Sequence, residues 1–271
     1  GSKSVPGDYS SIGEAIANVN AHGANTSGGS LTFNVAAASV FTETPCPLTA
    51  SGSSASNRII FQRSGAGVNP KIIAEGGGNF GSPLGTGGVT SSSTAIIAIN
   101  GADFVTFSGI DVASNNVLGA TPWSAIEYGY LLRNNNILAN VITINGAQNN
   151  IIENCAVTLD RRKTSPATTI GILQTAAASP GAGSTPTLAA HANSGNIYRD
   201  ITIKNCYSGV YLLGNATVPD LNCQITTSAC GSFNTIGDPA TSNDIGNGSI
   251  TTWGIRASNQ SGFTIENSIV R

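Results

Sequence analysis

Two stretches of the chain repeat each other without a gap: Ile97-Ala-Ile-Asn-Gly-Ala-Asp-Phe-Val-Thr-Phe-Ser-Gly-Ile-Asp-Val112 and Ile142-Thr-Ile-Asn-Gly-Ala-Gln-Asn-Asn-Ile-Ile-Glu-Asn-Cys-Ala-Val157. A shorter signature, which begins at Phe107 in the first stretch, recurs at irregular separations of 45, 51 and 62 residues. Its later copies are Ile152-Glu-Asn-Cys155, Ile203-Lys-Asn-Cys206 and Ile265-Glu-Asn-Ser268. This pattern predicts a solenoid with coils of about 20–25 residues, because insertions of unequal length fall between strands and leave the stack intact.

The first element of the chain is predicted to be a helix. Apolar residues recur at helical spacing from Ile12 to Val19, and Ser11 with Glu14 forms a capping box, so we expect a helix over about residues 11–20. After it the hydrophobic period changes to two, which predicts short strands. The first of these strands are Leu31–Val35, Arg58–Gln62 and Lys71–Ala74. No later segment sustains a helical stripe, which disfavours a sheet whose strands are joined by helices.

The composition excludes several classes of protein. Charged residues make up only 10% of the 271 residues, against about 25% in an ordinary soluble domain. Hydrophobic residues reach 40% and the net charge is -2, which is not the composition of a disordered chain. Because 12 Lys+Arg face 14 Asp+Glu, we expect no nucleic-acid partner. No stretch approaches the ~18 apolar residues of a membrane span.

Stacking of like positions explains the scarcity of charge. In a parallel stack each strand lies about 4.8 Å from the next, so like side chains sit above like and equal charges would repel. Asparagine is favoured at a repeated turn, because its amide can bond to the copies above and below. Asn154, Asn205 and Asn267 are therefore predicted to form a ladder. Their neighbours Glu153, Lys204 and Glu266 alternate in sign, which turns repulsion into pairing if their coils are adjacent.

Two segments near the amino terminus carry a resemblance to a known family. They are Gly7-Asp-Tyr-Ser-Ser-Ile-Gly-Glu-Ala-Ile16 and Phe33-Asn-Val-Ala-Ala-Ala-Ser-Val-Phe-Thr-Glu43. They resemble the opening of right-handed parallel β-helix proteins of the pectin-lyase fold, among them pectin methylesterases. The Ser/Asn/Thr-rich repeats are similar to β-helix modules of large secreted or surface proteins of Bacteroidetes. The resemblance implies an all-β fold, a single-stranded right-handed parallel β-helix with a short N-terminal capping α-helix.

We expect one β-helix domain over residues 1–271. Its coils run from about residue 30 to residue 271. Loop insertions are predicted at about 116–133, 164–196 and 215–248. The last strand, Phe263–Val270, reaches the terminus with no cap, although an open parallel edge is an aggregation liability that proteins usually cover. We therefore expect the native chain to continue beyond Arg271.

The catalytic motifs of the resembled enzymes are missing from this sequence. It lacks the Asp-Phe-Ile-Phe-Gly strand of pectin methylesterases and the Gly-His-Gly of polygalacturonases. A polysaccharide lyase is harder to exclude, because Ca²⁺ held by scattered carboxylates and one basic residue leaves little linear motif. Its candidate catalytic residues are Asp160, Arg162, Lys163 and Asp111, with Arg161 as a ligand-binding neighbour able to grip a carboxylate. The competing interpretation of residues 160–163 is a solvated turn.

Aromatic residues and cysteines complete the candidates. Trp123, Tyr128 and Tyr130 could stack on sugar rings, or could pack a loop onto its own stack. Cys155 and Cys206 are predicted to be reduced and to point into the core. Cys223 and Cys230 flank a short insertion and are predicted to form a disulfide, which leaves Cys46 without an assigned partner. The spacing of histidines predicts no metal site.

The sequence thus supports two hypotheses for function. The first is a secreted or cell-surface module with a structural, adhesive or glycan-binding role, whose partner is a polysaccharide or a cell-surface glycan. The second is a polysaccharide lyase or related carbohydrate-active enzyme that acts on uronic-acid polymers. We expect no cofactor for the first function, and Ca²⁺ could serve as one only if the protein is a lyase. The missing motifs favour the first hypothesis, because an enzyme must place its acid, base and charge stabiliser together.

Overall fold

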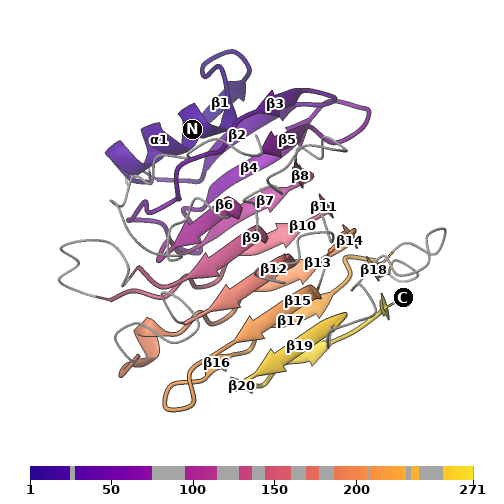
Figure 1. Ribbon diagram of the computed structural model, residues 1–271. Coiled ribbons are helices and arrows are strands. Elements are labelled where there is room, and N and C mark those ends of the chain that lie inside the picture. The colour runs from indigo at the N-terminus through magenta and orange to yellow at the C-terminus, as the bar shows by residue number, and fades with distance from the viewer. Residues whose placement is uncertain are drawn as a thin grey trace, which may run out of the picture.

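The computed structural model describes residues 1–24, 28–74, 95–114, 128–135, 144–159, 169–176, 186–206, 208–229, 233–237 and 253–270. The strands lie in three parallel sheets, which we call A, B and C, and the chain passes through them in turn from coil to coil. This arrangement is a parallel β-helix, as the repeats predict, with one short helix at its N-terminal end (Figure 1).

The sheets are built as follows. Sheet A contains, in order along the stack, β1 (Ser2–Val5), β2 (Leu31–Ala36), β4 (Ile59–Ser64), β7 (Val105–Ser108), β10 (Ile151–Glu153), β13 (Ile197–Arg199), β17 (Gln224–Thr226) and β21 (Thr264–Ile265). Sheet B contains β3 (Val40–Thr42), β5 (Lys71–Ala74), β8 (Asp111–Ser114), β11 (Ala156–Thr158), β14 (Thr202–Lys204), β18 (Asn234–Ile236) and β22 (Ser268–Val270). Sheet C contains β6 (Ala95–Asn100), β9 (Tyr128–Arg133), β12 (Ile170–Thr175), β15 (Ser208–Leu213) and β19 (Ile255–Ser258). A short pair, β16 (Asp220–Leu221) with β20 (Gln260–Ser261), and a 3-10 turn at Ala189–His191 complete the elements.

The core is a set of side-chain ladders that run along the stack. In sheet A the rings of Phe33, Phe61 and Phe107 lie one above the other, with centroids 4.6 Å and 4.9 Å apart and planes within 11° of parallel. Phe107 pairs with Ile152 on the next coil, and Val112 pairs with Val157 in sheet B. These pairs confirm the gapless repeat in the sequence.

The shorter signature is not one repeat, which corrects the sequence interpretation. Ile152 and Ile265 lie in sheet A, whereas Ile203 lies in sheet B and pairs with Val157. The motif Ile-x-Asn therefore occurs at the ends of strands in two different sheets. Because Glu153 lies in sheet A and Lys204 in sheet B, the two residues do not lie on neighbouring strands, and the predicted column of alternating charges is not formed.

The asparagine ladder also differs from the prediction. Asn154, Asn205 and Asn267 do adopt left-handed backbone, with φ between 47° and 53°, but Asn205 follows a sheet B strand and the other two follow sheet A strands. The buried asparagine ladder is formed by Asn150 and Asn196, at the entrance to sheet A. The backbone N–H of Asn150 donates to Oδ1 of Asn196 over 2.8 Å, so each amide satisfies the backbone of the coil before it.

The predicted loops contain strands that sequence periodicity missed. β9 lies within 116–133, β12 within 164–196, and β16, β17 and β18 within 215–248. In-register partners are separated by between 27 and 46 residues, longer than the predicted coils of about 20–25. Strands of sheet C such as β12 are buried on both faces, so they show no alternation between polar and apolar residues.

A column of glycines marks the entrance to sheet C. Gly129, Gly171, Gly209 and Gly254 occupy equivalent positions on four successive coils. A Cβ at Gly171 would lie 2.9 Å from the carbonyl oxygen of Gly209 and would collide with the side chain of Ile203 in sheet B. Only a residue without a side chain lets sheets B and C approach this closely.

The two ends of the stack differ. At the N-terminal end lies α1 (Ile12–His22), whose N-cap residue Ser11 accepts a hydrogen bond from the N–H of Glu14, as the capping box predicts. Its apolar face, including Ile12 and Val19, is fully buried. At the other end, Ile265 and Val270 are half exposed, and none of the described residues from 253 to 270 is buried.

Candidate functional site

A polar groove of about 570 Å³ follows the corner where sheet A turns into sheet B. Its floor is the turn itself, formed on three successive coils by Gly109, Asn154 and Asp200, which all have left-handed backbone with φ of 69°, 53° and 51°. Glycine, asparagine and aspartate are the residues that adopt this conformation most readily. The residue types that the turn requires thus also place polar groups in the groove.

The walls of the groove are two columns of outward-facing residues. Gln62 and Ser108 pair with each other in sheet A. Asp111, Ala156 and Thr202 lie in register on three coils of sheet B. The coil before them contributes two further lining residues, Arg63 and Asn69.

Internal hydrogen bonds hold the polar groups at the N-terminal end of this groove. Nη1 of Arg63 donates to Oδ1 of Asn69 over 3.1 Å, and Nδ2 of Asn69 donates to Oδ1 of Asp111 over 2.8 Å. The same oxygen of Asp111 accepts from the backbone N–H of Ala156, also over 2.8 Å. Asn69 donates in addition to the carbonyl oxygen of Asn154. These three side chains and two backbone groups are therefore fixed relative to one another before any ligand arrives.

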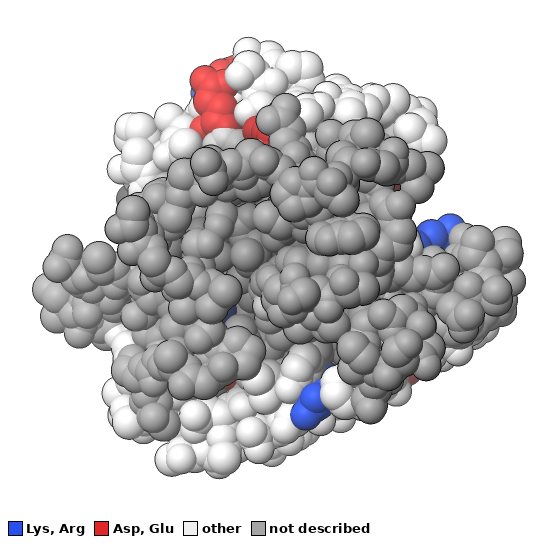
Figure 2. Space-filling model, in the orientation of Figure 1, with Lys and Arg blue, Asp and Glu red and all other residues white. Residues whose placement is uncertain are grey.

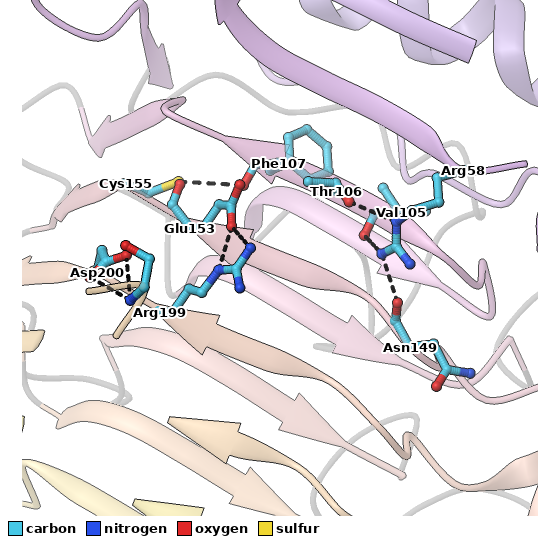
Figure 3. Close-up of polar contacts among 10 residues, drawn as sticks. Arg58, Val105, Thr106, Phe107, Asn149, Glu153, Cys155, Arg199 and Asp200 are labelled. Carbon is cyan, nitrogen blue, oxygen red and sulfur yellow. Dashed lines mark hydrogen bonds and ion pairs between the residues drawn. The ribbon is translucent and has the colours of Figure 1, made fainter. Parts of the chain in front are cut away.

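An ion pair lies beside the groove on sheet A. Glu153 and Arg199 are in register on neighbouring coils, and Nη2 of Arg199 lies 2.5 Å from Oε2 of Glu153. Figure 3 shows the two side chains facing each other from adjacent strands, with Asp200 at the turn that follows. The carboxylate of Asp200 accepts from the backbone N–H of Ser228 over 3.1 Å and 3.2 Å. Both acidic groups are thus bonded within the protein.

Arg58 lies on the same sheet, directly before β4 and at the opposite end of the strands from the groove. Its guanidinium donates to Oγ1 of Thr106 and to the carbonyl oxygens of Val105 and Asn149, at 3.0, 3.2 and 2.8 Å (Figure 3). Burial lowers the pKa of Arg58, yet the three bonds tie the side chain to two further coils. Arg58 thus donates three hydrogen bonds within the stack, and it is not among the residues that line the groove.

Cys155 lines the floor but cannot act as a nucleophile. Its side chain is 2% exposed, and burial raises the pKa of the thiol to about 12. The hydroxyl of Tyr130 lies 3.7 Å from its sulfur, and the carbonyl oxygen of Phe107 lies 3.8 Å away. A thiol that stays protonated at neutral pH is unreactive. Cys206 is likewise a free, buried cysteine, which confirms the prediction for both residues.

Of the residues proposed from the sequence, Asp111 lies in the groove. Asp160, Arg161, Arg162 and Lys163 lie outside the described residues, as does Trp123. Tyr128 is partly buried on the outer face of sheet C. Tyr130 is fully buried and its hydroxyl donates to the carbonyl oxygen of Ile110 over 2.7 Å, so it fills the core and presents no ring face to a sugar.

Of the two cysteines in the predicted disulfide, Cys223 is free and fully buried in the structure. Cys230 lies outside the described residues, so the pairing itself stays a prediction. Nε2 of Gln174 donates to the sulfur of Cys223 over 3.4 Å, and burial raises the pKa of the thiol to about 11. The residue occupies the inward position that Asn196 holds one coil earlier, since Ile197 pairs with Gln224. Sequence reasoning placed it in an insertion and so missed its place in the stack.

Within the described part of the chain, no group of three or more His, Cys, Asp or Glu side chains could hold a metal ion. The described helices include none that is long and apolar enough to cross a membrane. Outside its grey atoms, the view in Figure 2 is mostly uncharged, with charged atoms in a few separate places.

Four lining residues, Arg63, Asn69, Asp200 and Thr202, escaped the sequence analysis. Each lies at or beside a turn between sheets A and B, and the left-handed asparagine and aspartate of those turns were the available signal. We compared the chain with protein-family models, with curated proteins and with solved structures, and none of the three comparisons finds a match.

Proposed function

We propose that the chain is a non-catalytic module of a secreted or cell-surface protein, and that it binds a polysaccharide in the groove between sheets A and B. The supporting observation is the fixed chain of polar groups from Arg63 through Asn69 to Asp111. Sugar hydroxyls need donors and acceptors at defined positions, and groups that are already held lose little entropy when a ligand binds. The groove also repeats along the stack at about 4.8 Å per coil, which suits an extended polymer.

The disposition of the ionisable groups favours binding over turnover. The carboxylate of Asp111 holds the backbone of the next coil, and Arg63 is bonded to Asn69 and to the carbonyl oxygen of Gly67. A general base must reach the proton it removes, and a charge stabiliser must face the reacting group. Among the described lining residues, Arg63 and Asp111 are instead bonded to other groups of the protein. This arrangement is what a preorganised binding surface needs.

The resemblance to pectin-lyase-fold modules of secreted proteins is part of the same proposal. The alternative is a Ca²⁺-dependent lyase acting on uronic-acid polymers, and it would combine Asp111 with the cluster at residues 160–163. Release of unsaturated uronates from such polymers, measured by ultraviolet absorbance with and without Ca²⁺, separates the two functions. We expect no release by the wild-type chain.

A pair of matched variants tests the groove. Ala156→Tyr places a ring on the wall between Asp111 and Thr202 and removes no side-chain hydrogen bond. Thr158→Tyr places the same ring on the same strand, outside the groove lining. Both changes suit a β-strand, so the unfolding midpoint should change little in either.

The readout is a glycan array followed by calorimetric titration of each glycan that binds. We expect Ala156→Tyr to weaken binding at least tenfold and Thr158→Tyr to bind as the wild type does. Equal binding by all three proteins would show that the ligand binds elsewhere. An array on which the wild-type chain binds no glycan would refute the function itself.

A further inference from the structure

The last strand of sheet C carries an arginine that contacts two aromatic rings. In β19, the guanidinium carbon of Arg256 lies 4.2 Å from the ring centroid of Trp253 and 4.7 Å from that of Tyr211. Tyr211 is the in-register neighbour of Arg256 on β15, and the two rings are 6.4 Å apart. Because the distance between the two centroids is far shorter than the sum of their distances to the guanidinium carbon, the rings contact the guanidinium from adjacent sides and do not enclose it between them. The N–H donors of a guanidinium radiate in one plane, so the rings leave part of them uncovered.

These N–H groups have no acceptor in the described part of the chain. Arg256 forms neither an ion pair nor a hydrogen bond from its guanidinium there, and its contacts are with the two rings. Other arginines of the same stack behave differently. Arg58 donates three hydrogen bonds and Arg199 is paired with Glu153. Arg256 is therefore held by the two rings while its donors stay free. A guanidinium in this state is preorganised to bind an anion through two parallel hydrogen bonds.

The neighbouring ring adds a second kind of contact. Trp253 is 37% exposed although indole is a large apolar surface. A simple inorganic anion would use the guanidinium alone and would gain nothing from this exposed ring. A sugar that carries an acidic group would use both, because the apolar face of its ring packs on indole while the acidic group meets the guanidinium.

We propose that Trp253, Tyr211 and Arg256 form a binding site for an anionic sugar, that is, a sugar with a carboxylate or a sulfate group. The site lies on the outer face of sheet C, whereas the groove lies at the corner of sheets A and B. It is therefore a second site, independent of the groove. The competing explanation is that the three side chains only stabilise β19 through their cation–π contacts.

Tryptophan fluorescence tests this site directly. The chain has 2 tryptophans, so Trp123→Phe leaves Trp253 as the sole reporter. This protein is titrated with methyl glucuronide, with galactose 6-sulfate and with neutral methyl glucoside. We expect a saturable change in emission with one or both anionic sugars and none with the neutral sugar at the same concentration. The two anionic arms decide between a carboxylate and a sulfate.

Variants separate binding from stability. In the same background, Arg256→Gln should weaken binding at least tenfold, and Arg256→Lys should weaken it less, because lysine keeps the charge but loses the bidentate geometry. Lys71→Gln removes an exposed positive charge elsewhere and should leave binding unchanged. Ala156→Tyr should also leave it unchanged, so failure at this site and failure at the groove can be told apart.

Three results would overturn the proposal. They are a response to methyl glucoside equal to that of the anionic sugars, the absence of any saturable change, and unaltered binding by Arg256→Gln. Should Arg256→Gln fold poorly, the comparison of Arg256→Lys with Lys71→Gln still decides, because only the first should weaken binding.

Discussion

The glycine column at the entrance to sheet C can be tested by the sign of one change in stability, that caused by Gly171→Ala. In an unstrained strand, Gly171→Ala should stabilise the protein by about 0.4–1 kcal/mol, because alanine reduces the entropy of the unfolded chain. The structure predicts the opposite. The new Cβ would lie 2.9 Å from the carbonyl oxygen of Gly209 and would collide with the buried side chain of Ile203. A backbone oxygen held in a ladder cannot rotate away, so we expect a loss of about 1–3 kcal/mol, as for other overpacked cores.

Urea unfolding followed by far-ultraviolet circular dichroism measures this loss. Ile203→Ala should itself destabilise the protein by about 2–5 kcal/mol, since it removes a fully buried side chain. In that background Gly171→Ala should lose most of its penalty, which gives a coupling energy of about 0.5–3 kcal/mol between the two sites. An unfolding midpoint of Gly171→Ala at or above that of the wild type would refute the close approach of sheets B and C.

Three further predictions concern the core. Phe61→Ala should cost about 3–5 kcal/mol in urea unfolding, because it removes the middle ring of the stack, and a loss under 1 kcal/mol would contradict that packing. Burial raises the pKa of Asp220 above its ordinary 3.8, so the folded protein holds this proton more tightly than the unfolded chain does. The stabilisation by the protonated carboxyl is complete below pH 3.8 and is lost as the pH rises through the raised pKa. The urea midpoint of the wild type should accordingly fall relative to Asp220→Asn between about pH 4 and pH 7, and a constant or rising difference would contradict the raised pKa. Cys155, Cys206 and Cys223 should resist alkylation in the native protein and react after unfolding without reductant, as mass spectrometry can show, whereas a bonded Cys223 would not react.

The sequence predicts those parts of the fold that local chemistry controls. The capping box of Ser11 and Glu14 gives the start of α1, and alternation of polar and apolar residues gives β2, β4 and β5. These signals depend on neighbours in the chain. Sheet C lacks them, because strands such as β12 are buried on both faces. A glycine followed by apolar residues, as in Gly129-Tyr-Leu-Leu and Gly171-Ile-Leu-Gln, is the signal that would have found it.

The groove could be predicted only in part, because it depends on which residues lie in register. Asp111 is a candidate from the sequence that the structure places in the groove. Asp200 follows Asn154 in the same column, but the coil between them is 46 residues long while another coil is 27. Unequal coils hide the register, so the sequence cannot place Asn69 beside Asp111. The same uncertainty led Ile203 to be aligned with Ile152.

One column of sheet C shows where stacking alone no longer explains the residues. On successive coils its outward positions are Ala98, Leu131, Leu173, Tyr211 and Arg256, and the first three are buried. A parallel stack is most stable when like residues lie above one another. A leucine in place of Tyr211 or Arg256 would bury apolar surface against the residue on the neighbouring coil. Tyrosine and then arginine give up part of that burial and leave donors without acceptors in the described chain. Residues that weaken a stack at one place are expected where binding requires them, and this departure from the ladder is what separates Arg256 from the structural arginines of sheet A.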